Sequence, residues 1–326
     1  MIYICAQPAT FYYAWQVDTM IHSFHKNDVD LNDVHIVSAI HTKIDNHFLK
    51  VRDKWASRGV IFEFYEDTRV KPGYISSIRP HILEKHWLKY PELAKSHVFY
   101  HDCDIVLTKP IPDLDIKLNS NTTYVSDTIG YIGATYIESK KNGLLQAMCD
   151  IVDIDINLVR SKQKQSGGAQ YLLQPGIDVN FWKAVYKNSE ELFVTISKEI
   201  SIIKRSDPDW HELQIWCADM WAVLWNLWKM GLETIIHDDL TFTWATNKTE
   251  VWHRNAIFHN AGVTMESSTM PFYKGKYMRT NPTVAERPSD EWASQKYYDL
   301  VVEAWNDTNT MPVVKRMDPS IVTKKF

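Results

Sequence analysis

Short apolar segments alternate with longer segments of helical periodicity through the first half of the chain. The apolar segments lie at residues 2–6, 34–39, 60–65 and 98–100. Between them, apolar residues recur at helical spacing over residues 14–25, 48–58 and 80–93, where Pro91 ends the last helix early. Strands that alternate with helices are typical of α/β proteins, because each helix covers one face of the sheet. We therefore predict an α/β sheet flanked by helices.

The second half of the chain is less regular. Strands are predicted near residues 122–126, 235–237 and 256–259, and a glycine loop at residues 166–170. Helices are predicted at residues 177–188, 190–203, 209–230 and 289–305. Since neither an internal repeat nor a clear linker interrupts the chain, we expect one domain over residues 1–280 and a C-terminal helix and tail over residues 281–326.

The composition excludes several classes of protein. Of 326 residues, 45% are hydrophobic and 23% are charged, which is typical of a globular protein rather than a disordered one. The formal net charge of −4 argues against a wholly basic nucleic-acid-binding protein, although it leaves room for a local basic groove. No C-x-x-C pair occurs among the cysteines, so we expect neither a zinc cage nor a disulfide framework. The cysteines are Cys5, Cys103, Cys149 and Cys217.

We expect a cytoplasmic protein without a membrane partner. The chain starts with the strand-like segment 2–6 rather than a signal peptide. The most apolar later segment, residues 215–232, is interrupted by Asp219, Asn226 and Lys229, so it is predicted to be a core helix. The separated cysteines fit a reducing compartment. We interpret this compact chain, rich in Asn, Asp and Lys, as a viral or bacterial protein.

One acidic motif stands apart from the other Asp-x-Asp triplets. The triplet occurs five times, but only Asp102-Cys103-Asp104 follows a predicted strand and leads directly into another apolar segment, 105–107. At the carboxyl end of a strand in an open α/β sheet, side chains face the ligand crevice. Two carboxylates there can share Mg²⁺ or Mn²⁺, and such a metal neutralises a diphosphate leaving group. The alternative is a solvated turn whose carboxylates only cap backbone N–H groups.

Four segments around this motif resemble a known family. They are residues 11–17, residues 22–26, Lys71-Pro72-Gly73 with Trp87-Leu88, and residues 104–112. Together, over roughly residues 1–115, they are similar to GT-A-fold nucleotide-sugar glycosyltransferases. The closer likeness is to the hydroxyproline arabinosyltransferase and peptidyl-serine galactosyltransferase group.

The resemblance implies a GT-A fold, which is a Rossmann-like mixed sheet flanked by helices. In that reading residues 1–125 form a nucleotide-binding half and residues 126–280 an acceptor half. It also implies that Asp102 and Asp104 hold Mn²⁺ or Mg²⁺ against the diphosphate of a UDP-sugar donor. Further donor contacts are implied for Ala6, Gln7 and Pro8, at the base and ribose, and for Arg79. The alternative for Arg79 is an ordinary surface arginine.

Two later residues are candidates by the same resemblance. Metal-dependent retaining enzymes of the glycogenin type draw a third metal ligand from a histidine that ends a late strand, and a following lysine contacts the phosphates. Here His259 ends such a segment, and Lys274 follows at a longer spacing. An imidazole with two carboxylates is a sound ligand set for Mn²⁺. The alternative for His259 is a structural role in the core.

The candidates for the sugar and the acceptor come from three places. Gln170 in the glycine loop and Asp127 at a strand end are predicted to bind the donor sugar, with an ordinary turn as the alternative for the loop. Within the Trp-rich helix, Trp221, Leu224, Trp225 and Trp228 have the spacing of a buried face, so Asp219 needs a partner or a function there. Asp219 and Glu212 are the candidates for a catalytic base, which an inverting transferase requires.

These observations predict an enzyme that moves a sugar from a UDP-sugar to an acceptor hydroxyl. A 5-hydroxymethylpyrimidine in phage DNA is one acceptor, and a polysaccharide or protein hydroxyl is the alternative. A DNA acceptor would require basic residues that track phosphates. The candidates are Arg160, Lys162, Lys164, Lys204, Arg205, Lys274, Lys276 and Arg279. Two readings from other classes are a non-catalytic glycan-binding module and a metal-dependent phosphodiesterase.

Overall fold

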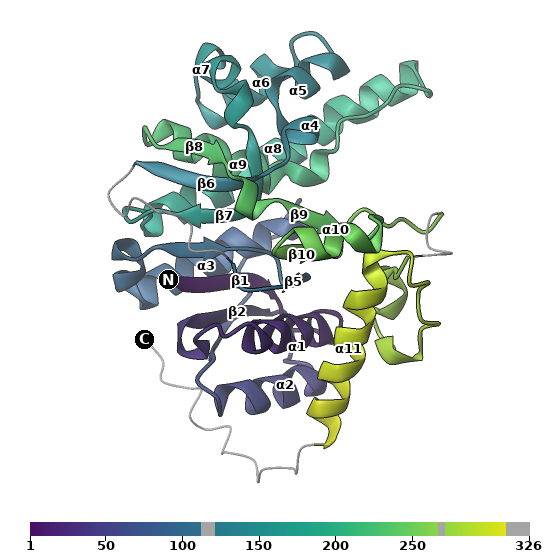
Figure 1. The fold of residues 1–326 in the computed structure, drawn as a ribbon. Helices are drawn as coiled ribbons and strands as arrows, with labels where there is room; N and C mark the ends of the chain where they lie inside the picture. Colours follow the sequence, from purple (N-terminus) through teal and green to yellow (C-terminus); the bar gives the residue numbers. More distant parts are fainter. Residues whose placement is uncertain (112–120, 267–270, 311–326) are drawn as a thin grey trace.

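The main sheet of the protein is mixed and is covered by helices on both faces (Figure 1). The structure is a computed structural model that describes residues 1–111, 121–266 and 271–310. In these residues the strand order is β3-β2-β1-β4-β7-β6-β8. The strands are β1 (Ile2–Pro8), β2 (Val34–Ile40), β3 (Ile61–Glu66), β4 (Val98–Tyr100), β6 (Thr122–Asp127), β7 (Gly167–Leu173) and β8 (Glu233–Ile236). The predicted α/β sheet flanked by helices is confirmed.

The strand direction in the sheet changes at β7. Strands β3, β2, β1 and β4 are parallel, whereas β7 is antiparallel to both β4 and β6. In β1, Ile4 and Ala6 belong to the core on one face, and Cys5 belongs to the core on the other. Both faces of this strand are buried, as expected for the parallel part of a sheet.

Helices complete these two cores. α1 (Phe11–Lys26) and α2 (Asn46–Ala56) cover one face, and α3 (Ile78–Lys89), α8 (Val179–Ser206) and α9 (Ala218–Lys229) cover the other. The predicted core residues Trp221, Leu224, Trp225 and Trp228 are all buried. Four shorter helices lie beyond β6 at the top of Figure 1. They are α4 (Ile129–Ile132), α5 (Ala134–Lys140), α6 (Leu144–Val152) and α7 (Ile156–Ser161).

A second, three-stranded sheet lies beside the first. It consists of β5 (Ile105–Leu107), β10 (Ile257–His259) and β9 (Phe242–Trp244), in that order. α10 (Thr249–Arg254) connects β9 to β10, and α11 (Ala293–Thr310) packs against α1. β10 is antiparallel to β5, so that His259 pairs with Ile105. This pairing brings residue 259 next to the acidic motif.

The expected glycine loop at residues 166–170 is wrong, because Gly167 and Gly168 begin β7. A Cβ on Gly167 would lie 2.3 Å from Val125 Cγ2, and one on Gly168 would lie 2.5 Å from the Tyr171 hydroxyl. The register between β6 and β7 also shifts between Val125 and Ser126. The glycines therefore serve the close approach of two backbones in a bulged strand pair, rather than a turn.

The helix predictions need two further corrections. The helix expected at residues 209–230 begins only at Ala218, because the Trp210 indole N–H donates to the Lys140 carbonyl and the Gln214 N–H donates to the Tyr136 hydroxyl. These tertiary contacts hold residues 210–214 outside helical geometry. The helices expected at residues 177–188 and 190–203 form one helix, α8, with Asp178 as its N-cap.

Helix α3 ends at Lys89, which confirms the predicted early end before Pro91. All four cysteines are buried and free. None of the described helices combines the length and the apolar character that crossing a membrane requires. The division of the chain at residues 125 and 280 stays a prediction, and Pro112 and the tail from residue 311 lie outside the described residues.

A buried ion pair connects α11 to the N-terminal helices. Lys54 Nζ in α2 lies 3.0 Å from Asp18 Oδ1 in α1 and 2.9 Å from Asp307 Oδ2 in α11. The side chains of Lys54 and Asp18 are each only 1% exposed. Thr308 donates a further hydrogen bond to Asp18. The three helices thus share one satisfied polar cluster in an otherwise apolar interface.

We predict that Lys54→Met lowers the free energy of unfolding by about 3–5 kcal/mol, because Asp18 stays buried without its cation. The matched control is Lys26→Met, since Lys26 also pairs with α11, through Glu303, but both side chains are 48% exposed. That control should change stability by at most about 1 kcal/mol. Urea unfolding of both variants measures the difference, and equal losses would contradict the argument.

Candidate functional site

The acidic motif lies where two parallel strands end. β1 and β4 are neighbours, so Ala6, Gln7 and Pro8 at the end of β1 lie at the same edge of the sheet as the segment that follows β4. Asp102 and Asp104 occupy the short connection between β4 and β5. Asp102 is partly exposed, with its side chain 30% accessible, whereas Asp104 is buried. The predicted position of the motif at a strand end is therefore what the structure has.

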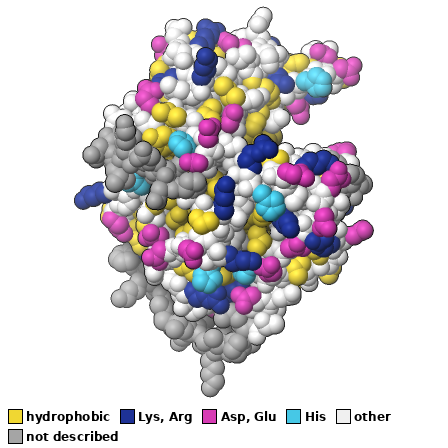
Figure 2. Space-filling view, in the orientation of Figure 1, with side chains coloured by type: hydrophobic (Ala, Val, Ile, Leu, Met, Phe, Trp, Pro, Cys, Tyr) yellow, Lys and Arg dark blue, Asp and Glu magenta, His cyan; other side chains and the backbone are white. Residues whose placement is uncertain are grey.

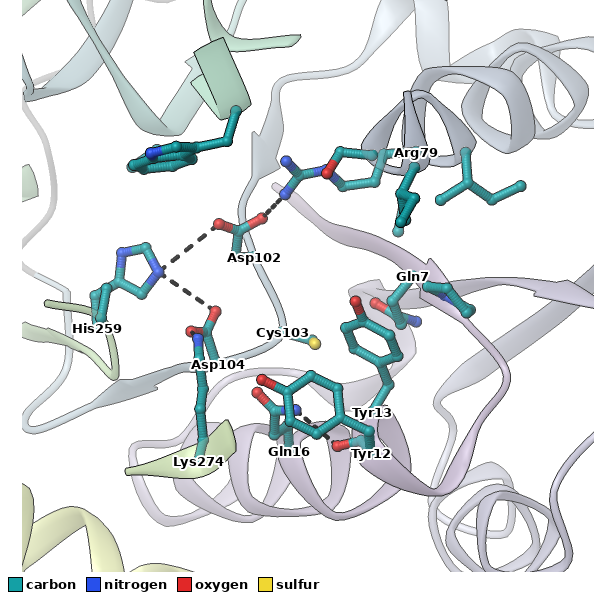
Figure 3. A pocket seen from close by; sticks show the side chains of 18 of the residues that line it. Gln7, Tyr12, Tyr13, Gln16, Arg79, Asp102, Cys103, Asp104, His259 and Lys274 are labelled. Atoms are coloured by element: carbon teal, nitrogen blue, oxygen red, sulfur yellow. Dashed lines mark hydrogen bonds and ion pairs between the residues drawn. The ribbon is translucent and has the colours of Figure 1, made fainter. Parts of the chain in front are cut away.

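His259 completes a cluster with the two carboxylates (Figure 3). Its Nε2 atom lies 3.3 Å from Asp104 Oδ1 and 3.7 Å from Asp102 Oδ2. The Asn260 N–H also donates to the Asp104 carbonyl at 2.9 Å, which fixes the two segments against each other. One ligand atom from each of the three side chains lies within 4.8 Å of the others. This spacing fits a single metal ion.

Gln170 in β7 lies behind His259 and is fully buried. Its amide contacts His259 Nδ1 at 3.3 Å and the Ser126 hydroxyl at 2.6 Å. A hydroxyl both donates and accepts, so either orientation of the amide satisfies Ser126. In the structure the amide nitrogen faces His259 Nδ1, and the amide oxygen accepts from Ser126. With the amide turned over, its oxygen would accept from Nδ1–H, and Nε2 would keep a free lone pair for a metal. The orientation of the Gln170 amide thus decides which tautomer of the histidine is favoured.

Arg79, near the start of α3, connects the motif to α9. Its guanidinium pairs with Asp102 on one side and with Asp219 on the other. The second oxygen of Asp219 accepts a 2.7 Å hydrogen bond from the Tyr74 hydroxyl. Burial raises the pKa of Asp219, and Arg79 opposes that shift. Asp219 therefore has the partner that an acid in an apolar helix needs, and Arg79 is held between two carboxylates.

Lys274 supplies a second cation to the cluster. It belongs to the short 3-10 helix Lys274–Tyr277, and its ammonium pairs with Asp104. Burial alone would raise the pKa of Asp104, but Lys274 and then His259 lower that pKa well below its usual range. Burial lowers the pKa of Lys274, yet the pairing with Asp104 raises it overall. Both groups of this pair are therefore charged at neutral pH.

Arg79, Asp102, Asp104, His259 and Lys274 line one cavity of about 260 Å³. Figure 2 shows the molecule hollowed between the part that carries α4–α8 and the part that carries α10 and α11. On one side of the acidic motif the cavity is lined by Ala6, Gln7, Pro8, Tyr12, Tyr13 and Gln16, from β1 and α1. The lining also includes Ile75, Ile78, Tyr131, Trp216, Met220 and Trp244.

Gln7 offers a fixed hydrogen-bond acceptor to this cavity. Its amide nitrogen donates to the Val37 carbonyl at 3.1 Å and to the Ser38 hydroxyl at 3.0 Å. Because a carbonyl only accepts, this contact fixes which end of the amide is the nitrogen. The amide oxygen is buried without a hydrogen-bond partner in the described chain, and Figure 3 shows it turned toward Tyr13.

The sequence-predicted residues divide into two groups. Ala6, Gln7, Pro8, Arg79, Asp102, Asp104, His259 and Lys274 all line the cavity. Gln170 and Asp219 lie behind His259 and Arg79, and they do not line it. Asp127 is exposed and accepts from the Ile129 N–H, and Glu212 is exposed outside the cavity lining. The roles predicted for these four residues stay predictions.

Sequence reasoning missed several residues of the cavity. Tyr12, Tyr13 and Gln16 share the face of α1 that follows β1, and their polar atoms within an apolar helix were a usable signal. Trp216 belongs to a Trp-rich segment whose spacing indicated core, yet it is 57% exposed. Its exposure depends on where α9 begins, which the sequence pattern did not predict.

Comparisons with known proteins give matches only among solved structures. No family model matches the chain, and no curated protein does. The bifunctional glycosyltransferase WbbM, in its apo form, is 12% identical with a TM-score of 0.49, over 95% of this chain and 50% of that one. The galactosyltransferase LgtC, in complex with donor and acceptor sugar analogs, is 13% identical with a TM-score of 0.43, over 94% of this chain and 100% of that one.

The glycosyltransferase GlyE of Streptococcus pneumoniae TIGR4 is 10% identical with a TM-score of 0.39, over 97% of this chain and 66% of that one. The chain thus spans about half the length of WbbM and 66% of GlyE. All three TM-scores are below 0.5, and the likeness to the hydroxyproline arabinosyltransferase subgroup stays a prediction. With identities of 10–13%, activity, donor and acceptor have to be supported by the site itself.

We predict that Arg79→Gln destabilises the protein more at pH 8 than at pH 5. Without the guanidinium, burial raises the pKa of Asp219 further, so the folded state keeps a proton that the unfolded state releases. The variant then loses free energy of unfolding as the pH rises from about 4, the pKa of an unfolded aspartate, through the pKa of Asp219 in the folded variant. The loss at pH 8 should be about 2–3 kcal/mol, below the value for a fully buried pair, because the Arg79 side chain is 23% exposed.

Thermal unfolding of the wild type, Arg79→Gln and the double variant Arg79→Gln/Asp219→Asn measures this effect. The double variant should lose the added pH dependence, since it removes the titrating carboxyl. A deficit of Arg79→Gln that is the same at pH 5 and pH 8 would contradict the argument.

Proposed function

We propose that this protein is a metal-dependent glycosyltransferase that moves a sugar from a UDP-sugar to an acceptor hydroxyl. The observation that carries the proposal is the convergence of Asp102, Asp104 and His259 at the end of the parallel strands, in a cavity that also holds two cations. Carboxylates that converge with cations in a crevice are an arrangement suited to a metal–diphosphate complex.

The three donors fit Mn²⁺ or Mg²⁺. Carboxylate oxygens suit both ions, and an imidazole nitrogen favours Mn²⁺. Asp104 turns one oxygen to His259 and the other to Lys274, so the oxygen facing His259 is the one available to a shared ion. When bound, the metal neutralises the negative charge that grows on the diphosphate as it leaves.

The chain's own cations support the same leaving group. Lys274 and Arg79 both line the cavity beside the acidic motif. Burial lowers the pKa of Arg79, but Asp219 and then Asp102 raise it well above its usual value, so the guanidinium keeps its charge. Fixed cations that face a developing charge stabilise the transition state without reorganisation. In the transfer, the bond from the anomeric carbon to the phosphate oxygen breaks, the bond to the acceptor oxygen forms, and the acceptor proton passes to a phosphate oxygen or to water.

The β1 side of the cavity fits the nucleoside. The free amide oxygen of Gln7 accepts from an N–H, such as the imide of uracil. Tyr12 and Tyr13 add flat side chains on this side. Burial raises the pKa of Tyr12 to about 12, so its hydroxyl stays a neutral donor. This chemistry supports UDP as the nucleotide.

Asp219 is better placed to position Arg79 than to act as a base. Both of its oxygens are engaged, by Arg79 and by Tyr74. Glu212 lies outside the cavity lining. The proposal therefore assigns no carboxylate base, which agrees with a retaining reaction, because such a reaction does not need one.

The acceptor is proposed as a hydroxyl compound. A 5-hydroxymethylpyrimidine in DNA would need cations that are available to phosphates. Two of the candidate cations are engaged already, since Arg160 pairs with Glu138 and Lys162 pairs with Glu233. This pairing favours a polysaccharide or protein hydroxyl over DNA. A non-catalytic glycan-binding module remains the alternative, and it requires no metal-dependent nucleotide binding.

Thermal unfolding with nucleotides tests the proposal. We expect UDP with Mn²⁺ to stabilise the protein, by about 2.7 kcal/mol at 100 times its Kd, and we expect weaker effects of GDP and CDP. UDP without metal should have little effect. Asp102→Asn and Asp104→Asn should abolish the metal-dependent part, because each removes a charged ligand.

Asp53→Asn is the matched control, since Asp53 is a 52% exposed carboxylate outside the cavity lining and should leave the effect intact. The proposal fails if no nucleotide stabilises the protein with or without Mn²⁺.

A second prediction concerns the tautomer of His259. Gln170→Leu removes the polar group that contacts Nδ1 and holds the imidazole, so the affinity for Mn²⁺ should fall about 10–100-fold. Gln170→Glu keeps an acceptor at this position and should retain most of the affinity. Electron paramagnetic resonance of free Mn²⁺ during titration measures both values. Equal affinities of wild type and Gln170→Leu would show that Gln170 does not orient the histidine.

A further inference from the structure

The cavity has an apolar wall that the proposed donor chemistry does not use. It consists of Ile75, Tyr131, Trp216, Met220 and Trp244, none of which belongs to β1 or α1. Trp216 is 57% exposed and Ile75 is 82% exposed. Exposed large apolar side chains beside a cavity mark a binding surface.

Hydrogen bonds hold the backbone of this wall in place, although the side chains of Trp216 and Ile75 are exposed. The Tyr74 hydroxyl lies 2.5 Å from the Trp216 carbonyl and 2.7 Å from Asp219 Oδ1, and these two acceptors share its single proton. Arg69 donates to the carbonyls of Tyr74 and Ile75, each at 3.2 Å. The Glu190 carboxylate accepts from the Gly73 N–H at 2.9 Å. The exposed side chains therefore stand on a preorganised backbone, which lowers the entropy cost of binding.

The rings of the wall form a row that ends at the metal cluster. The ring centroids of Trp216 and Tyr131 lie 6.3 Å apart with an interplanar angle of 26°, and those of Tyr131 and Trp244 lie 6.4 Å apart at 69°, which is an edge-on contact. Trp244 is in turn parallel to His259, with centroids 6.4 Å apart. The row thus connects the exposed Trp216 to the cluster of Asp102, Asp104 and His259.

We propose that the wall is the acceptor subsite and that it binds a pyranose ring of a glycan. This inference rests on the proposed function. A pyranose has an apolar C–H face, which packs on an indole, and a hydroxyl edge, which can face the acidic motif. We expect the ligand on this wall to be neutral, because none of the side chains of the wall carries a charge. A nucleic acid would instead need free cations near the wall.

Saturation-transfer NMR with defined probes tests the inference. The probes are methyl glycosides of glucose, galactose, mannose and xylose, together with lactose and cellobiose, each with UDP and Mn²⁺ at saturation. We expect at least one glycoside to bind to the wild type. Trp216→Ala should weaken that binding about tenfold, and Trp216→Tyr, which keeps a flat ring, should retain most of it. Leu88→Ala is the control, since Leu88 is 72% exposed and lies outside the cavity lining.

Thermal stabilisation by UDP and Mn²⁺ is measured on every variant and should be unchanged, so failure of the donor site is seen separately. If UDP binds but no glycoside does, or if Trp216→Ala binds glycosides like the wild type, the acceptor subsite is overturned and the proposed function stands. Binding of a duplex containing 5-hydroxymethylcytosine in place of any glycoside overturns it as well. Glycoside binding through Trp216 without any UDP binding overturns the transferase and leaves a glycan-binding module.

Discussion

Three carboxylates lie close together at one edge of the sheet, and their mutual repulsion has to be compensated. Asp219, Asp102 and Asp104 alternate with Arg79, His259 and Lys274 in one continuous series of contacts. Each positive or neutral partner comes from a different part of the chain, namely α3, β10 and the segment after it. Compensation of charge is therefore also what draws these distant segments into one site.

The same constraint explains why two sheets meet there. Asp102 and Asp104 follow β4 of the main sheet. His259 belongs to β10 of the small sheet, and β10 pairs with β5, which begins just after the motif. The connection from β4 to β5 is short, so the acids cannot move away from the histidine. Gln170 and Ser126 of the main sheet then support the imidazole from behind. Both sheets thus determine the geometry of the ligand set.

How much the sequence predicted depends on how local each interaction is. The α/β sheet flanked by helices and the position of Asp102 and Asp104 at a strand end follow from short-range patterns, and both predictions agree with the structure. Gly167 and Gly168 looked like a turn because the pattern does not show Val125 and Tyr171, which leave no room for a Cβ. The late start of α9 depends on contacts with Lys140 and Tyr136, about 70 residues earlier, and the sequence alone does not show them. His259 and Lys274 were suggested by the family resemblance rather than by any local pattern.

The cluster of Lys54 with α11 has a consequence for the order in which the protein is made. Lys54 and Asp18 are buried together only when Asp307 and Thr308 cover them, and α1 also carries Tyr12, Tyr13 and Gln16. At roughly 5–20 residues per second, the 254 residues between Lys54 and Thr308 take about 13–50 s to synthesise. Until then the first two helices have an uncovered charge pair at their surface. The β1–α1 side of the cavity, although encoded first, is therefore among the last parts of the molecule to reach its final form.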